Sequence, residues 1–348
     1  MRTAFAICLS LVLFSCTLTQ GDRSAPVEPR LTHQSSGIDA LLIGVHALND
    51  RVVWASGTGG VFLRTTNGGA TWETGVVPGA DTLQFRDVHA FSADVAYLLS
   101  IGPGASSRIY KTLDGGLNWD LQFVNDEPRA FFDCFDFWDE NSGIAFSDEV
   151  EGGLPIARTL DGRTWNVLSE DNWPDALEGE GGFAASGTCI RTLGKETAVI
   201  GSGNARSARI HMTRDRGETW TVVSTPLAGG EGIGIASLAF RDERRGVALG
   251  GDLGKPESLA DNVAVTNDGS RNWHLGGRPT FTGAVYGSSY VPGSDRLVAV
   301  GPRGASISGD DGRTWTSLDT LSYWSVDFGS PGAGWAVGPE GRITKITF

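Results

Sequence analysis

A short motif that runs from Thr or Ser to Trp returns six times along this chain. The copies read TTNGGATW, TLDGGLNW, TLDGRTW, TRDRGETW, TNDGSRNW and SGDDGRTW, and they end at Trp72, Trp119, Trp165, Trp220, Trp273 and Trp315. A near-regular period of this size indicates stacked copies of one supersecondary unit. Within each copy, an Asp or Asn side chain can bond backbone amides of a tight turn, and Gly can supply a positive φ. We therefore expect each Thr–Trp motif to be a hairpin turn, closed by the Thr hydroxyl.

Two strand-like runs precede each motif, which predicts four strands per unit, A to D from the axis outward. Strand B is the clearest, as in VVWASG at residues 52–57 and GWAVG at residues 334–338, and it occurs seven times. The last unit lacks a fourth strand, which residues 31–34 can supply from the other end of the chain. Such closure removes an open sheet edge. The sequence thus predicts an all-β fold, a seven-bladed β-propeller closed by an N-terminal outer strand in the last blade.

The N-terminal part is predicted to be a leader. An apolar run at residues 4–14 follows Arg2 and is too short to span a bilayer. It leads to Cys16 in the sequence LFSC, which resembles a bacterial lipobox, although a leader that is simply cleaved is the alternative. We expect a signal segment over residues 1–16, a flexible tether over 17–29 and the propeller over 30–348. The protein would then be extracytoplasmic, in the periplasm or at the outer membrane, and membrane-bound by its lipid alone.

Charge and composition exclude some classes of function. The chain has 28 Lys and Arg against 41 Asp and Glu, for a formal net charge of −13. An acidic surface argues against nucleic acid as a partner, which needs basic patches. The five histidines are scattered and form no metal-ligand pattern. We expect no metal, no cofactor and a monomeric protein.

The irregular insertions are predicted to share one face of the disc. Thr–Trp motifs and A–B turns lie on one face, while B–C loops and D–A crossovers lie on the other, here called the B–C loop face. The B–C loops are long in three adjacent units, at residues 147–155, 201–209 and 250–262, and the longest crossover, 169–187, joins units three and four. Insertions confined to one face often mark a binding face.

These loops carry charges of both signs within Gly-rich backbone. Such a cluster could bind a polar group or perform acid–base chemistry, although solvated loop charges would look the same. The candidate binding residues are Asp148, Glu180, Arg206, Arg209, Asp252, Lys255 and Asn262. No complete catalytic motif is present, so no residue is assigned a catalytic role.

Cys134 and Cys189 stand at the same position of strand A in adjacent units. Symmetry would point both side chains the same way round the ring. Although an extracytoplasmic cysteine pair invites a disulfide, we therefore predict two buried free thiols with Cα atoms more than about 7 Å apart.

The motifs resemble the Asp-box (BNR) repeat of WD40/YVTN/BNR-like propellers. Beyond them, residues 31–348 resemble the seven-bladed photosystem II stability/assembly factor-like proteins, in the succession of VWAVG-like strand, Gly-rich loop, strand and DGGxTW turn. The pattern is visible at residues 334–338 and 308–315. The match is to a non-photosynthetic bacterial branch, whose members are often labelled hydrolases or oxidoreductases. The resemblance implies a scaffold that binds a partner protein. The arginine patch of the photosynthetic members is matched only loosely, by Arg108, Arg206, Arg209, Arg303 and Arg342.

Three functions remain open at this point. The first is a lipid-anchored propeller that binds or assembles a protein or glycan partner on its B–C loop face without catalysis. The second is a glycoside hydrolase, sialidase-like or of another BNR type, which a carboxyl pair about 5–9.5 Å apart in a pocket would favour. The Arg-Ile-Pro start of sialidases is absent, since Tyr110 follows Arg108 and Ile109. The third, an oxidoreductase, needs a cofactor site, and none is visible.

Overall fold

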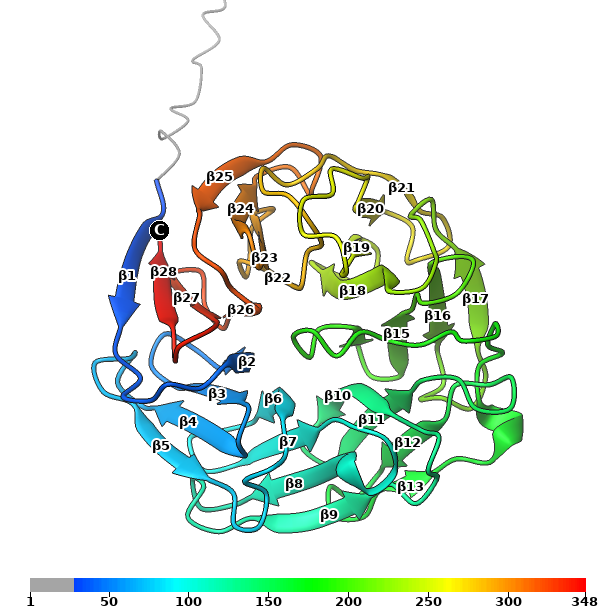
Figure 1. Cartoon of the computed structure of the whole chain (residues 1–348), viewed down its shortest axis with the longest axis horizontal. Coiled ribbons are helices and arrows are strands. Elements are labelled where there is room, and N and C mark those ends of the chain that lie inside the picture. The colour runs from blue at the N-terminus through cyan, green and yellow to red at the C-terminus, as the bar shows by residue number, and fades with distance from the viewer. Residues whose placement is uncertain (1–27) are drawn as a thin grey trace, which may run out of the picture.

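The computed structural model describes residues 28–348, which form a ring of seven four-stranded antiparallel sheets around a central axis (Figure 1). The predicted seven-bladed propeller is confirmed. The expected signal segment, most of the tether and Cys16 lie outside the described residues. Within residues 28–348, no helix has the length and apolar character needed to cross a membrane.

The blades follow one another along the chain, each with its first strand at the axis. Blades one and two hold β2 (Leu42–Ala47), β3 (Val53–Gly57), β4 (Val61–Thr65), β5 (Glu73–Val76), β6 (Phe85–Ala90), β7 (Ala96–Ser100), η1 (Gly104–Ser106), β8 (Arg108–Thr112) and β9 (Asp120–Val124). Blades three and four hold β10 (Phe132–Asp139), β11 (Ser142–Ser147), β12 (Ile156–Thr159), β13 (Asn166–Val167), η2 (Glu170–Asn172), β14 (Ile190–Leu193), β15 (Thr197–Gly201), β16 (Arg209–Thr213) and β17 (Thr221–Ser224).

The second half of the ring has the same order. Blades five and six hold β18 (Ile233–Phe240), β19 (Gly246–Asp252), β20 (Val263–Thr266), β21 (His274–Leu275), β22 (Gly287–Tyr290), β23 (Leu297–Gly301), β24 (Gly304–Ser308) and β25 (Thr316–Asp319). Blade seven holds β26 (Ser325–Phe328), β27 (Ala333–Val337) and β28 (Ile343–Thr347), with β1 (Arg30–Gln34) as its outer strand.

The ring closes as the missing fourth strand predicted. Strand β1 pairs antiparallel with β28, with Arg30 opposite Thr347 and Gln34 opposite Ile343. Gln34 adds a side-chain link, because its Oε1 accepts hydrogen bonds from Nε1 of Trp72 in blade one and of Trp335 in blade seven, at 3.2 and 3.1 Å. The N-terminal segment therefore covers the edge of β28 and joins the first blade to the last.

The hydrophobic core lies between the blades. Each of the seven clusters of buried apolar side chains contains residues from two neighbouring blades. Val53 and Leu63 of blade one, for example, belong to the same cluster as Trp335 of blade seven. Because both faces of a blade are covered, inner strands such as β3 are buried at every position.

The Thr–Trp motifs form the expected turns between the third and fourth strands. In blade two, the Thr112 hydroxyl donates to Oδ1 of Asp114 (3.0 Å) and accepts from the amide of Gly116 (2.9 Å). Oδ1 of Asp114 also accepts from the Asn118 amide (2.8 Å). The Thr and Asp side chains of this turn thus bond within the turn itself.

The prediction of two free thiols is wrong. Cys134 and Cys189 form a disulfide, with Cα atoms 6.0 Å apart. The symmetry argument assumed regular strands, but β10 shifts register between Phe132 and Cys134, and Cys189 lies just before β14. Neither side chain is therefore held to the regular alternation of a strand.

An axial cavity as candidate functional site

The crossover between blades three and four enters the axial channel. Its last part, residues 181–189, is here called the axial segment. In Figure 1 the green chain between β13 and β15 reaches into the middle of the ring. The carbonyl of Ser186 accepts from Oγ of Ser325 in blade seven (3.2 Å), and the Ser186 hydroxyl donates to the carbonyl of Tyr286 in blade six (2.6 Å). Nη1 of Arg86 in blade two donates to the carbonyl of Ala184 (3.0 Å). The axial segment therefore bonds blades that are far apart in sequence.

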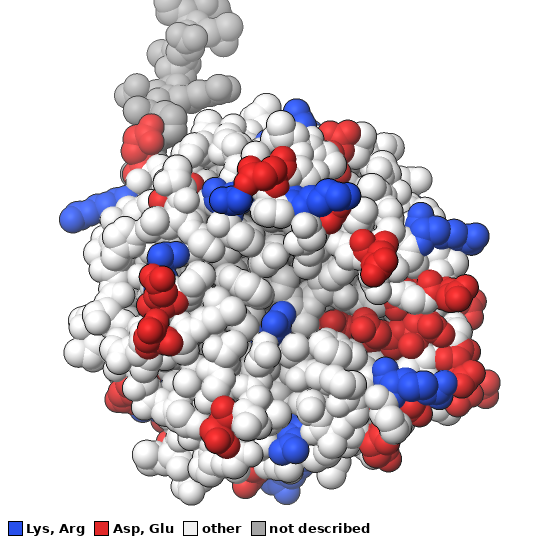
Figure 2. Space-filling view, in the orientation of Figure 1, with Lys and Arg blue, Asp and Glu red and all other residues white. Residues whose placement is uncertain are grey.

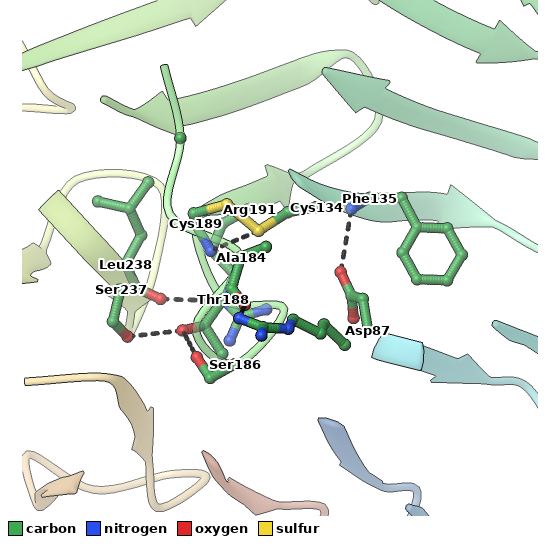
Figure 3. The surroundings of a disulfide bond; sticks show 12 residues. Asp87, Cys134, Phe135, Ala184, Ser186, Thr188, Cys189, Arg191, Ser237 and Leu238 are labelled. Atoms are coloured by element: carbon green, nitrogen blue, oxygen red, sulfur yellow. Dashed lines mark hydrogen bonds between the residues drawn. A yellow bond between two sulfur atoms is a disulfide. The ribbon is translucent and has the colours of Figure 1, made fainter. Parts of the chain in front are cut away.

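The axial segment is also fixed on its other side (Figure 3). The Thr188 hydroxyl lies between those of Ser186 and Ser237, at 2.6 and 2.8 Å, and Cys189 is bridged to Cys134. Gly187 has φ 73°, and a Cβ there would lie 2.3 Å from Oδ1 of Asp87, so only glycine fits.

Backbone hydrogen bonds join the long loops to the axial segment. The amides of Gly181 and Gly203 each donate to the other residue's carbonyl, at 3.2 and 2.9 Å. The Glu149 amide donates to the carbonyl of Glu180 (2.8 Å), and the Asn204 amide donates to that of Ile233 (3.0 Å). The long loops of blades three and four and the start of β18 in blade five thus form one connected surface on the B–C loop face.

A cavity of about 390 Å³ opens beside the axial segment. Its lining comes from the starts of inner strands, from the B–C loops and from the axial segment, and it consists of Arg86, Phe131, Asp133, Asp148, Gly182, Phe183, Ala184, Ala185, Asn204, Leu253, Tyr286 and Trp324. Figure 2 shows a hollow in the middle of the ring, with acidic side chains gathered beside it over β15–β17. The cavity thus combines apolar walls with a few charged groups, as ligand sites commonly do.

Two carboxyl groups in this cavity interact directly. Asp133 is 2% exposed and lies at the register shift of β10, while Asp148 follows β11. Burial and the neighbouring Asp148 raise the pKa of Asp133 well above its usual value. Burial raises the pKa of Asp148 to about 6, although its hydrogen bond to Asp133 opposes this rise. Because two close carboxylates cannot both ionise cheaply, the pair shares one proton near neutral pH.

Arg86 is the basic group of the cavity lining. It lies at the register shift of β6, the position that Asp133 has in β10. Its Nε and Nη2 donate to Oε1 of Gln84 (3.2 and 2.9 Å), and its guanidinium carbon lies 5.4 Å from the centre of the Trp324 ring. Tyr286 packs edge-on against Trp324, with centroids 5.0 Å apart. Arg86 is therefore held by other groups and forms no ion pair with either carboxyl.

Solved structures share this fold. YCF48 bound to D1 peptide aligns with a TM-score of 0.64 at 17% identity, over 92% of this chain and 95% of that chain. YCF48 from Cyanidioschyzon merolae gives 0.64 at 15% identity, over 91% and 98%. The GH74 enzyme from Niastella koreensis gives 0.62 at 15% identity, over 90% of this chain and 53% of that chain. The shared feature is the β-propeller. At these identities the likeness shows the fold alone, and no protein-family model and no curated protein sequence matches the chain.

The predicted site residues fall into different surroundings. Asp148 lines the axial cavity, as described. Arg206 is exposed on its B–C loop, and Lys255 pairs with Asp252 (2.9 Å) on the loop of blade five. Asn262 is buried and donates to the carbonyl of Gly283 (3.1 Å). The structure thus brings only Asp148 of this group into the cavity.

Glu180 and Arg209 lie below the surface rather than on the rim. Glu180 is fully buried and forms an ion pair with Arg209. Its Oε1 also lies 3.0 Å from Nε2 of His211. Burial alone would raise the pKa of Glu180, but His211 and Arg209 outweigh it and lower this pKa to about 2. This cluster fixes the middle of the crossover to β16.

Sequence reasoning missed Asp133, Arg86, Tyr286 and Trp324. A signal for them was present, because Arg86 and Asp133 share one strand position, and Tyr286 and Trp324 directly precede β22 and β26. Comparing the residues that open the seven inner strands would have placed these four side chains around the channel mouth.

Proposed function

We propose that this protein is a non-catalytic binding or assembly scaffold that takes a segment of a protein partner on its B–C loop face. The axial cavity carries the proposal, because it lies on that face and combines buried charged groups with aromatic walls. The D1 peptide bound to YCF48 supports a protein partner by analogy of fold. A glycan is less favoured, because the Trp324 ring already contacts Arg86 and Tyr286.

The axial cavity does not favour the glycoside hydrolase alternative. Glycosidases need two carboxyl groups about 5–9.5 Å apart, on either side of the scissile bond. Asp133 and Asp148 are hydrogen-bonded to each other, which is too close for either geometry. The oxidoreductase alternative is not favoured either. Thiol–disulfide exchange needs access to sulfur, and Cys134 and Cys189 are both fully buried.

We further propose that the protein is anchored outside the cytoplasm through Cys16, and that the Thr–Trp motifs are Asp-box repeats. The Cys134–Cys189 disulfide supports an oxidising compartment, where such bonds persist. Radiolabelled palmitate fed to the expressing bacterium should label the full chain but not its Cys16→Ser variant. A chain that is recovered unlabelled and soluble would contradict the anchor.

Two leucines on opposite faces provide a matched test of the partner proposal. Leu253 lines the cavity, whereas Leu113 is 59% exposed in a Thr–Trp motif. We expect Leu253→Trp to abolish capture of the partner from an envelope extract, because the indole fills the cavity mouth, and Leu113→Trp to leave capture unchanged. Thermal unfolding of both variants checks their folding. Unchanged capture by Leu253→Trp, or loss with Leu113→Trp, would place the interface elsewhere.

A further inference from the structure

The carboxyl pair of the axial cavity lacks a counter-ion among the described residues. No Lys, Arg or His nitrogen there lies within ion-pair distance of Asp133 or Asp148, and Oδ2 of Asp133 receives no hydrogen bond from a protein donor. Arg86 is near enough to feel the charge of Asp133, but Gln84 and the Ala184 carbonyl hold its guanidinium. Burying carboxyl groups without a partner is costly, and proteins usually avoid it.

The backbone around the pair encloses it closely. The Gly182 amide donates to Oδ1 of Asp148 at 3.1 Å. A Cβ on Gly182 would lie 2.8 Å from Cγ of Asp133, and one on Gly181 would overlap Oδ1 of Asp148. The axial segment therefore needs glycine at both positions in order to approach the two carboxyl groups. A loop that merely crossed the channel mouth would not require this approach.

The rest of the lining suits an alkyl chain that ends in a positive charge. Phe131, Phe183 and Tyr286 supply aromatic wall, and aromatic faces attract organic cations. An ammonium or guanidinium group offers several N–H donors to two carboxylates at once. In the empty cavity, the shared proton reduces the negative charge of the pair, which a bound cation would balance instead.

We propose that the axial cavity binds the cationic end of a lysine or arginine side chain, presented by the protein partner, between Asp133 and Asp148. This inference rests on the proposed function and specifies the chemistry of the partner. The acidic side chains beside the hollow would draw a basic segment toward it (Figure 2). A free small amine carries the same chemistry, and the test separates the two sources.

Below the pKa of Asp148 the pair carries a second proton, and binding of a cation should release it. The pKa of Asp148 is about 6 in the empty cavity, and a cation lowers it, so affinity rises as pH increases through this range. Arg86 of blade two and Tyr286 of blade six line the same cavity, and Glu180, next to Gly181, is already neutralised by Arg209. A cation that lowers this pKa by about one unit binds about tenfold more tightly above the window than below it.

Calorimetry on the full chain tests the proposal. The probes are the acetylated amides of lysine and arginine, alone and within a short glycine peptide, with the uncharged norleucine and citrulline amides as shape controls and putrescine as the free amine. We expect the charged probes alone to bind, with proton release seen as a buffer-dependent heat near pH 6. A peptide preferred over putrescine indicates a protein source, while the reverse preference would overturn that source.

Two variants make the test specific. Asp148→Asn keeps the shape and the acceptor for Gly182 but removes the charge, so it should weaken charged probes at least about tenfold and reduce proton release near pH 6. Asp139→Asn, exposed at the far end of β10, should change neither. Equal binding of charged and uncharged probes, or unchanged binding to Asp148→Asn, would overturn the cation site. Partner capture lost in Leu253→Trp would then still support the face, so the two failures remain distinguishable.

Discussion

At the scale of the residue, Glu180 is a charged side chain that stabilises the fold from a buried position instead of binding a ligand at the surface. The sequence placed it among Gly-rich loop residues and suggested binding. In the structure its carboxylate is enclosed by Arg209 and His211, directly before the axial segment. No pattern within residues 169–187 predicts that Glu180 is buried against Arg209 and His211, because both partners lie in β16.

Replacing Glu180 should therefore affect stability strongly. We expect Glu180→Ala to lower the free energy of unfolding by about 3–5 kcal/mol, because Arg209 would lose the carboxylate that compensates its charge. The exposed neighbour Glu178 is the control, and Glu178→Ala should change it by less than about 0.5 kcal/mol. Urea unfolding measures both. The contribution should be present above the ordinary pKa of 4.5 and be lost as pH falls toward 2. Equal effects of the two substitutions would contradict the buried ion pair.

At the scale of the element, the strands were predictable and the axial segment was not. Repeated B strands and Thr–Trp motifs specify a blade locally, and the strand missing from the last blade specified β1. The axial segment depends on Ser325, Tyr286 and Arg86, which come from three other blades. Contacts of such sequence separation leave no periodic pattern, so only its unusual length was visible.

The Cys134–Cys189 disulfide fixes one end of the axial segment. A non-reducing mass of the folded chain should be two hydrogens lower than that of the reduced chain. The double substitution Cys134→Ser with Cys189→Ser should lower the free energy of unfolding by about 2–4 kcal/mol, since the bond closes a loop over a separation of 55 residues. A mass that retains both thiol hydrogens would restore the free-thiol prediction.

At the scale of the whole molecule, the two faces of the disc differ in how much their sequence varies from blade to blade. The Thr–Trp motifs bond themselves, as Thr112 and Asp114 do, and repeat almost unchanged. The B–C loop face carries the long loops and the axial cavity, and the sequence predicted that the irregular insertions share this face. It could not locate the cavity itself, because Asp133 and Trp324 come to line one cavity only when the ring closes.

Hydrogen–deuterium exchange of the protein with its captured partner tests the choice of face most directly. We expect slower exchange in the loop at residues 147–155 and in the axial segment, with no change in the six Thr–Trp motifs. The Leu253→Trp variant, mixed with the same partner, should show no protection in either region. Protection confined to the Thr–Trp motifs, with the axial segment exchanging as in the free protein, would contradict the account.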